Sequence, residues 1–454
     1  MNIFIAGDGE VGFYIAEALV NSKHDITIID PHEELLKLVE SHTDLLTIVG
    51  ESNSVSVLKQ AGIEKADLVI SVLHNETVNI ITAILAKKLG AKNTIARVNT
   101  MQNLSIENRK IYEDLGIDHL VSPEDIAGHE VVNLVNTPEV YEMFNLTDDK
   151  LSVFLIKIEE DAPVIDKTLI QISDEHGPLN FRAVAINRNQ SSFIPTGTSN
   201  FQKGDMVYVV SKPDSLEELF ALAGKRKFDI NNIMVVGGGR VGKVICKNME
   251  SDYNIKLIET DIDRCHVLTD FLDDTLIIHG DARSVELLDE EGIENTDVFI
   301  AVTNSSETNI LTCLHAKKFG VRKTVALVEN LDYIEISQNI GIDTILNKKL
   351  IAASYIVKHA MGREVSSIKK CLSGINSDIV ELVAMPGSIV TKKPIKELKI
   401  PEGTIIGGII RGKDSFIAVG DFQILEDDKV VVFALPGTTD KIEKMFQKKG
   451  SVFN

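Results

Sequence analysis

A glycine-rich motif occurs twice in the chain, with an offset of 230 residues between the copies. The copies are Gly7-Asp8-Gly9-Glu10-Val11-Gly12 and Gly237-Gly238-Gly239-Arg240-Val241-Gly242. The same offset aligns residues 79–90 with residues 309–320, where seven of the twelve positions are identical. A short motif that arises by chance does not bring matching surroundings with it. The chain is therefore an internal repeat whose unit is about half its length.

Length and charge indicate a multidomain protein that binds neither nucleic acid nor lipid. The 454 residues are too many for one hydrophobic core, and they carry a formal charge of −20 without a polybasic tail. We therefore expect no binding to nucleic acid and no direct binding to lipid. No apolar run approaches the roughly 18 residues that cross a bilayer, and Met1 leads straight into an apolar strand with no room for a signal peptide. These features predict a cytoplasmic protein. None of the four cysteines forms a Cys-x-x-Cys motif with another, so we expect reduced thiols and no metal site.

Each glycine motif lies in the context that a dinucleotide site needs. In the first copy, residues 2–6 form an apolar strand, the glycines form the turn, and an amphipathic helix follows. The three glycines of such a motif permit the tight turn, the approach of the backbone to a pyrophosphate and close helix packing. A second strand ends in Asp30, and its counterpart in the other half ends in Glu259. Carboxylates at this position accept hydrogen bonds from ribose hydroxyls and repel a 2′-phosphate, so they favour NAD over NADP.

The two glycine turns differ in charge. Arg240 stands where the first copy has Glu10. A cation beside a polyphosphate strengthens binding and a carboxylate weakens it, so we expect the second copy to prefer the more highly charged nucleotide. Residues 237–243 also match the opening of a P-loop, but Val244 replaces the Ser or Thr that would hold magnesium. We interpret that match as coincidence.

Further candidate ligands follow other strands, because the carboxyl ends of the strands face the nucleotide in a doubly wound sheet. These candidates are Glu51, Leu73, His74 and Arg97 in the first copy and Asp281, Thr303 and Asn304 in the second. Leu327 takes the place of Arg97 in the second copy, so two interpretations of Arg97 are open. It contacts phosphate or a neighbouring subunit, or it is a solvated surface arginine. Asp67 and Asp297 open their strands and are expected in turns at the opposite edge.

The periodicity changes after each nucleotide-binding unit from that of helices to that of strands. We predict an α/β protein with two doubly wound parallel-sheet Rossmann domains, each followed by a helix and a small β-rich α+β domain. The predicted order is residues 1–121 (nucleotide-binding), 122–139 (crossover helix), 140–225 (β-rich), 230–346 (nucleotide-binding), 347–365 (crossover helix) and 366–449 (β-rich).

The sequence shows no candidate catalytic residues. A dehydrogenase needs a proton donor and an electrostatic partner placed against the nicotinamide, and the eleven histidines have no catalytic or metal-ligand spacing. We expect a protein that senses a nucleotide and does not consume it. The alternative from another class is an NAD-dependent oxidoreductase, similar to saccharopine dehydrogenase, with a catalytic pair that the sequence does not reveal.

The order of domains closely resembles the TrkA family, the peripheral regulatory subunits of Trk-type bacterial potassium uptake systems, which are built from two RCK (regulator of potassium conductance) modules. The motifs that carry the resemblance are the two glycine turns with Asp30 and Glu259, residues 66–73, residues 96–98 and residues 303–309. The resemblance covers essentially the whole chain. The sequence departs from the family pattern in residues 74–79 and in the acidic turn at residues 8–10.

This resemblance implies a homo-oligomer, namely a tetramer whose eight nucleotide-binding units form a ring on the inner face of the cell membrane. It implies NAD(H) and adenine nucleotides (ATP or ADP) as ligands, and a membrane potassium channel or transporter subunit (TrkH-like) as the partner. A cytosolic nucleotide sensor with another partner is a third reading that the sequence leaves open.

Overall fold

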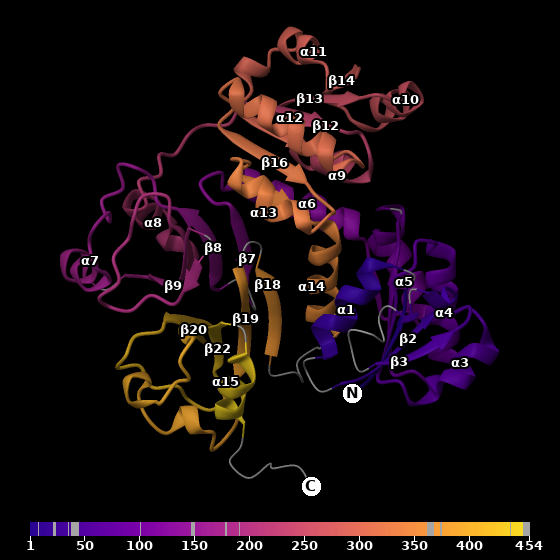
Figure 1. Cartoon of the computed structure of the whole chain (residues 1–454). Coiled ribbons are helices and arrows are strands. Elements are labelled where there is room, and N and C mark those ends of the chain that lie inside the picture. The colour runs from indigo at the N-terminus through magenta and orange to yellow at the C-terminus, as the bar shows by residue number, and fades with distance from the viewer. Residues whose placement is uncertain are drawn as a thin grey trace. The chain divides into compact units, whose positions relative to one another are not determined.

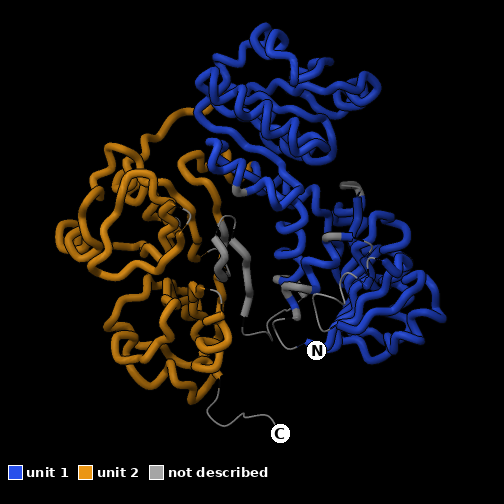
Figure 2. Tube along the Cα trace, in the orientation of Figure 1, with its two compact units in different colours: residues 1–131, 232–362 blue, residues 132–231, 363–454 orange. Residues whose placement is uncertain are grey.

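The computed structural model describes most of the chain, and all structural statements below concern this described part. It comprises residues 1–7, 9–20, 24–34, 36–37, 45–99, 101–146, 150–177, 179–189, 191–360, 367–372, 375–435 and 437–447. The chain forms two compact units (Figure 2). Unit 1 consists of residues 1–131 and 232–362, and unit 2 consists of residues 132–231 and 363–454. Each unit therefore contains one piece of each half of the repeat.

The first nucleotide-binding domain is a six-stranded sheet in the order β3-β2-β1-β4-β5-β6, with every strand parallel to its neighbours. Its central strands β1 and β4 are mainly apolar because they are buried on both faces. The order reverses at β1, which pairs with β2 on one side and β4 on the other. The main elements are β1 (Asn2–Ala6), α1 (Glu10–Val20), β2 (Asp25–Asp30), β3 (Leu46–Val49), α3 (Val55–Ala61), β4 (Leu68–Ser71), α4 (Glu76–Leu89), β5 (Asn93–Arg97), α5 (Ile106–Asp114), β6 (His119–Val121) and α6 (Pro123–Asn136).

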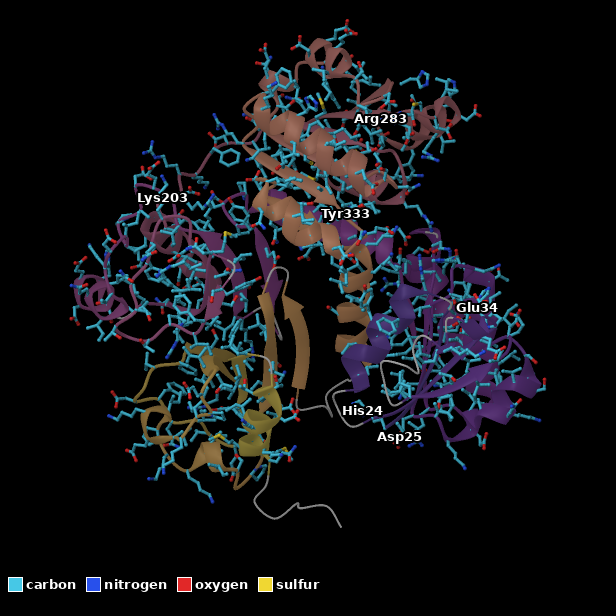
Figure 3. All side chains as sticks on the ribbon, in the orientation of Figure 1. His24, Asp25, Glu34, Lys203, Arg283 and Tyr333 are labelled. Atoms are coloured by element: carbon cyan, nitrogen blue, oxygen red, sulfur yellow. The ribbon has the colours of Figure 1, made fainter. Side chains whose placement is uncertain are left out.

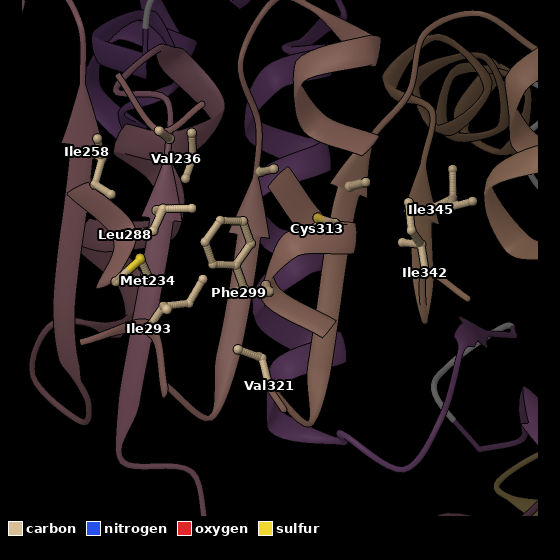
Figure 4. Packing of buried hydrophobic residues seen from close by; sticks show 14 of the residues in the cluster. Met234, Val236, Ile258, Leu288, Ile293, Phe299, Cys313, Val321, Ile342 and Ile345 are labelled. Atoms are coloured by element: carbon tan, nitrogen blue, oxygen red, sulfur yellow. The ribbon is translucent and has the colours of Figure 1, made fainter. Parts of the chain in front are cut away.

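The second nucleotide-binding domain repeats this sheet in the order β14-β13-β12-β15-β16-β17. Its core lies between the sheet and the helices and includes Met234, Phe299 and Cys313, all of them buried (Figure 4). The elements are β12 (Asn232–Val236), α9 (Arg240–Met249), β13 (Asn254–Glu259), α10 (Ile262–Phe271), β14 (Thr275–His279), α11 (Val285–Glu290), β15 (Val298–Ala301), α12 (Ser306–Lys318), β16 (Lys323–Leu327), α13 (Asp332–Asn339), β17 (Thr344–Leu346) and α14 (Lys348–Ala360).

The predicted helices after each domain are present as α6 and α14. Ser122 caps the start of α6 by accepting a hydrogen bond from Asp125 N at 3.2 Å, and Asn347 caps α14 in the same way through Lys349 N at 3.0 Å. Within unit 1, each of these helices packs against the nucleotide-binding domain of the other half of the repeat. Helix α14 packs on α1 (Figure 1), and a Cβ at Gly128 of α6 would lie 2.5 Å from the side chain of Val244 in α9.

Unit 2 contains two antiparallel five-stranded sheets, in the orders β10-β9-β11-β8-β7 and β18-β19-β22-β20-β21. Both sheets contribute to one apolar core that includes Tyr208 and Phe433. With the parallel sheets of unit 1, they confirm the predicted fold class. The elements are β7 (Glu142–Asn145), β8 (Ser152–Lys157), α7 (Leu169–His176), β9 (Phe181–Arg188), β10 (Ser191–Phe193), β11 (Met206–Ser211), α8 (Leu216–Leu222), β18 (Ser367–Leu372), β19 (Ile375–Val383), β20 (Thr404–Arg411), β21 (Asp414–Ile417), β22 (Lys429–Ala434) and α15 (Thr439–Phe446).

The turn before the last strand of each small sheet contains the same ion pair. Arg188 Nη2 lies 2.7 Å from the buried carboxylate of Asp205, and Arg411 Nη2 lies 2.7 Å from that of Asp428. Each carboxylate also accepts a backbone N–H of its own turn, so the pair closes the turn. The repeat predicted from the sequence therefore extends into the smaller domains.

Candidate nucleotide-binding sites

At two positions of the second glycine turn, Gly237 and Gly242, a side chain would collide with backbone atoms. Gly237 adopts φ +104°, and a Cβ there would lie 2.9 Å from Thr303 N. A Cβ at Gly242 would lie 2.0 Å from the Gly237 carbonyl oxygen, so helix α9 begins in direct contact with the strand end. A Cβ at Gly239 would meet no atom within 4 Å. The open side of the turn is therefore at Gly239, where the first backbone N–H groups of α9 are free to face an anion.

The first glycine turn is also tight. A Cβ at Gly7 would lie 3.2 Å from Gly12 Cα, and one at Gly9 would lie 3.9 Å from His74 Nε2. Asp8 and the side chain of Glu10 lie outside the described residues, so the predicted charge difference between the turns has no structural account in the first copy. Val11 and Val241 are buried, which means that they can offer a ligand only their backbone.

The two strand-end carboxylates are buried, and each accepts a backbone hydrogen bond. Asp30 Oδ1 accepts His32 N at 2.7 Å, and Glu259 Oε2 accepts Gly238 N at 2.8 Å. Burial by itself would raise the pKa of Glu259, but the backbone N–H groups of Asp261 and Gly238 and the Arg264 guanidinium outweigh it and hold the pKa below its usual value. Glu259 is therefore a charged acceptor beside the glycine turn, as ribose binding requires.

Two buried asparagines, Asn79 and Asn309, hold the loops beside the glycine turns, and neither was among the predicted ligands. Asn79 Oδ1 accepts Leu73 N, and its Nδ2 donates to Arg97 O at 3.0 Å. In the second half, Asn309 Oδ1 accepts Thr303 N and its Nδ2 donates to Leu327 O at 2.8 Å. Each amide thus ties the ends of two adjacent strands together. The signal in the sequence was the presence of a polar residue at the same position of both apolar helices.

The other predicted ligands are divided between the loops. His74 and Asn304 are both exposed, and His74 Nε2 would lie 3.9 Å from a Cβ at Gly9. Glu51 and Asp281 follow the edge strands β3 and β14. Arg283, which is labelled in Figure 3, binds the Asp281 carboxylate: its Nη2 lies 2.6 Å from Asp281 Oδ2, and this contact lowers the pKa of Asp281.

Arg97 is not the solvated arginine that one interpretation predicted. Its side chain is 8% exposed and its Nη2 lies 3.2 Å from Oε1 of Glu124, which is 5% exposed. The same Glu124 oxygen lies 3.8 Å from Arg240 Nη2, in the glycine turn of the other half. The interpretation of Arg97 as a solvated arginine is wrong because its ion-pair partner, Glu124, lies at the start of α6. Strand periodicity does not reveal such a contact between two elements. Glu124 thus connects the first half to the second nucleotide site.

The P-loop reading of residues 237–243 is not supported by the position of its lysine. Lys243 Nζ lies 3.5 Å from the centre of the Phe271 ring, an arrangement typical of a cation–π contact. Among the described residues, no group of three or more His, Cys, Asp or Glu side chains could hold a metal ion. None of the described helices is long and apolar enough to span a membrane.

Comparison with known proteins decides the family. Residues 3–123 and 233–348 match the TrkA-N domain, and residues 153–224 and 379–447 match the TrkA-C domain. The chain is 32% identical to a Trk system potassium uptake protein TrkA homolog of Archaeoglobus fulgidus, over 98% of this chain and all of that protein. The chain belongs to the TrkA family. It is also 29% identical to the Trk system potassium uptake protein TrkA of Vibrio alginolyticus, over 98% of this chain and 99% of that protein.

Solved structures show the same fold for this member of the TrkA family. The GsuK RCK domain is 15% identical, with a TM-score of 0.59 over 98% of this chain and 94% of that chain. The GsuK channel bound to NAD has the same identity and TM-score, and the match covers 98% of this chain and 78% of that chain. At this level of identity the likeness concerns the fold.

Proposed function

We propose that this TrkA-family chain is the nucleotide-sensing regulatory subunit of a Trk-type potassium uptake system. In this proposal it binds NAD(H) and adenine nucleotides in the cytoplasm, assembles as a tetramer on the inner face of the membrane and controls a membrane potassium channel or transporter subunit. The observation that supports the proposal is a pair of glycine turns in one unit, each followed by a strand that ends in a buried carboxylate. Glu124 lies close to Arg97 of the first half and to Arg240 in the glycine turn of the second half. The names of the relatives support potassium uptake, and the NAD-bound neighbour supports the ligand class.

The contact between Arg240 and Glu124 supplies a physical route from ligand to fold. Arg240 is half-exposed, so it can turn from the carboxylate to a bound polyphosphate, with which it forms a stronger pair. Glu124 would then keep only Arg97, and the packing between α6 and α9 would be free to adjust. A ligand shifts such an equilibrium by no more than the difference between its affinities for the two arrangements. Regulation through this contact needs no chemical turnover of the nucleotide.

The first prediction concerns the two carboxylates. Asp30→Ala and Glu259→Ala should each weaken NADH binding at their own site by about 1 to 3 kcal/mol, because a hydrogen-bond acceptor for ribose is lost. Isothermal titration calorimetry on the full-length protein measures this. Asp297→Ala is the matched control, since Asp297 accepts Asn232 N at the opposite edge of the sheet and should leave the affinity unchanged.

The same variants test the function. Rubidium flux through vesicles that contain a Trk-type membrane subunit should change when wild-type protein and NADH or ATP are added together. The double variant Asp30→Ala with Glu259→Ala should lose this response. A rubidium flux that does not change when the protein and nucleotide are added would contradict the proposal. Steady oxidation of NADH by the purified protein would contradict it too and would favour an oxidoreductase.

Both nucleotide-binding domains expose apolar side chains at equivalent positions, which supports self-association. Ile111 (56% exposed) and Leu115 (43%) at the end of α5 correspond to Ile336 (56%) and Ile340 (47%) at the end of α13. Exposed apolar faces mark interaction surfaces, and here the same face is exposed in both halves. A second copy of the chain is the occupant that the repetition favours, because each copy brings the same faces.

A second prediction follows for the assembly. Ile111→Lys combined with Ile336→Lys should reduce the molar mass in solution from that of a tetramer to that of a smaller species, because a buried ammonium is unfavourable in an apolar contact. Light scattering coupled to size-exclusion chromatography measures the mass. Val419→Lys replaces an equally exposed apolar residue in unit 2 (53%) and should have no effect. An unchanged mass in the double variant would exclude these faces from the assembly.

A further inference from the structure

The Glu259 carboxylate is surrounded by four donors. Oε2 accepts Gly238 N at 2.8 Å and lies 3.2 Å from Arg264 Nη1. Oε1 accepts Asp261 N at 3.0 Å and the Thr260 hydroxyl at 3.2 Å. A carboxylate has about four acceptor positions. The acceptor positions of Glu259 are therefore filled before any ribose binds.

Two of these donors can give way to ribose hydroxyls and two cannot. The N–H groups of Gly238 and Asp261 belong to the backbone of the glycine turn and of the cap of α10. The Thr260 hydroxyl and the Arg264 guanidinium are on side chains that can rotate, and Arg264 is 45% exposed. A ribose that bonds to Glu259 must therefore replace the two side-chain donors.

Arg264 stays close to the site when it is replaced. Its Nη2 already lies 3.7 Å from Asp261 Oδ2, and its backbone N–H donates to Asp261 Oδ1 at the start of α10. When ribose displaces the guanidinium from Glu259, the Asp261 carboxylate, two residues further along the chain, can still hold it. Arg264 therefore remains a cation at the edge of the ribose. A cation in this place offsets the repulsion between Glu259 and a phosphate on that ribose.

The first half has no such cation at the corresponding position. By the spacing from Asp30, the residue equivalent to Arg264 is Leu35. Among the described residues, His32 contacts Asp30, with Nδ1 3.0 Å from Oδ1. The two ribose sites therefore differ in their charged neighbours, although both end in an acid.

We propose that Arg264 is a specificity-determining residue of the second nucleotide site, which makes that site accept a dinucleotide with a 2′-phosphate more readily than the first site does. This inference rests on the proposed nucleotide binding. It refines the expectation that the acid in each half favours NAD over NADP.

The test uses full-length protein with Asp30→Ala, which weakens the first site, and calorimetric titration with NADH and with NADPH. Adding Arg264→Leu, the residue of the first half, should lower the affinity for NADPH relative to NADH by about tenfold, the effect of losing one charged hydrogen bond. Arg264→Lys should retain most of the ratio because it keeps the charge. Arg226→Leu, an exposed arginine of unit 2, should leave the ratio unchanged.

An equal loss for both dinucleotides would overturn the inference, because Arg264 would then only hold Glu259 in place. Unchanged affinities for both dinucleotides in Arg264→Leu would overturn it as well, because Arg264 would then have no part in binding. If the wild-type protein binds neither NADH nor NADPH, the proposed nucleotide binding itself is wrong, and this inference falls with it.

Discussion

Replacing Gly242 by alanine is expected to destabilise the second nucleotide-binding domain by about 3 kcal/mol. The new Cβ would lie 2.0 Å from the Gly237 carbonyl oxygen, so α9 would have to move away from the strand end. Overpacking against backbone typically costs about 1 to 3 kcal/mol, and here neither partner is a side chain that can rotate away. The apparent Tm, followed by circular dichroism on the full-length protein, should fall by several degrees. Binding of NADH at this site should be lost with it.

Gly239→Ala is the matched control within the same turn. A Cβ at Gly239 meets nothing within 4 Å, and the residue has φ −67°, which any residue adopts. The Tm should remain near that of the wild type. NADH affinity should nevertheless fall, because this is the open side of the turn where a ligand would approach. Equal Tm values for Gly242→Ala and the wild type would refute the close contact.

Replacing Glu124 by glutamine is expected to destabilise unit 1 by about 3 kcal/mol or more. The Arg97 guanidinium would stay buried without a counter-charge, and removing one partner of a buried ion pair is strongly destabilising. Most of this loss of stability should come from the buried Arg97, because the Arg240 side chain is 51% exposed and a pair that is open to solvent contributes less. Urea unfolding monitored by circular dichroism measures the change.

A double variant separates the charge from the packing. Arg97→Leu combined with Glu124→Leu should be close to the wild type in stability, since apolar replacement of a whole buried pair is often neutral. The second half already carries Leu327 at the position of Arg97. However, the double variant should lose any coupling between nucleotide at the second site and the packing of α6. If the double variant has a free energy of unfolding as low as that of Glu124→Gln, the packing of the two side chains, and not their charges, stabilises unit 1.

The backbone organisation follows from local signals. The motif with Gly7 and the motif with Gly237 each predict a strand, a turn and a helix, because only glycine fits where the chain turns tightly and elements approach closely. Asp30 and Glu259 end the next strand in both halves and lie beside the turns, since parallel strands end at one edge of a sheet. Repetition of these features was enough to predict two parallel sheets and a nucleotide site on each.

The connections between the halves were decided by tertiary structure. The partners Arg97 and Glu124 lie on different elements, and Arg240 reaches the same carboxylate from the other half of the repeat. Likewise, Arg264 appears in the sequence as an ordinary charge in the first turn of a helix, and only the fold places it on Glu259. Periodicity and motif spacing report which residues share a strand or a helix face. They carry no information on which charge of one element meets which charge of another, and that pairing depends on how the two halves pack.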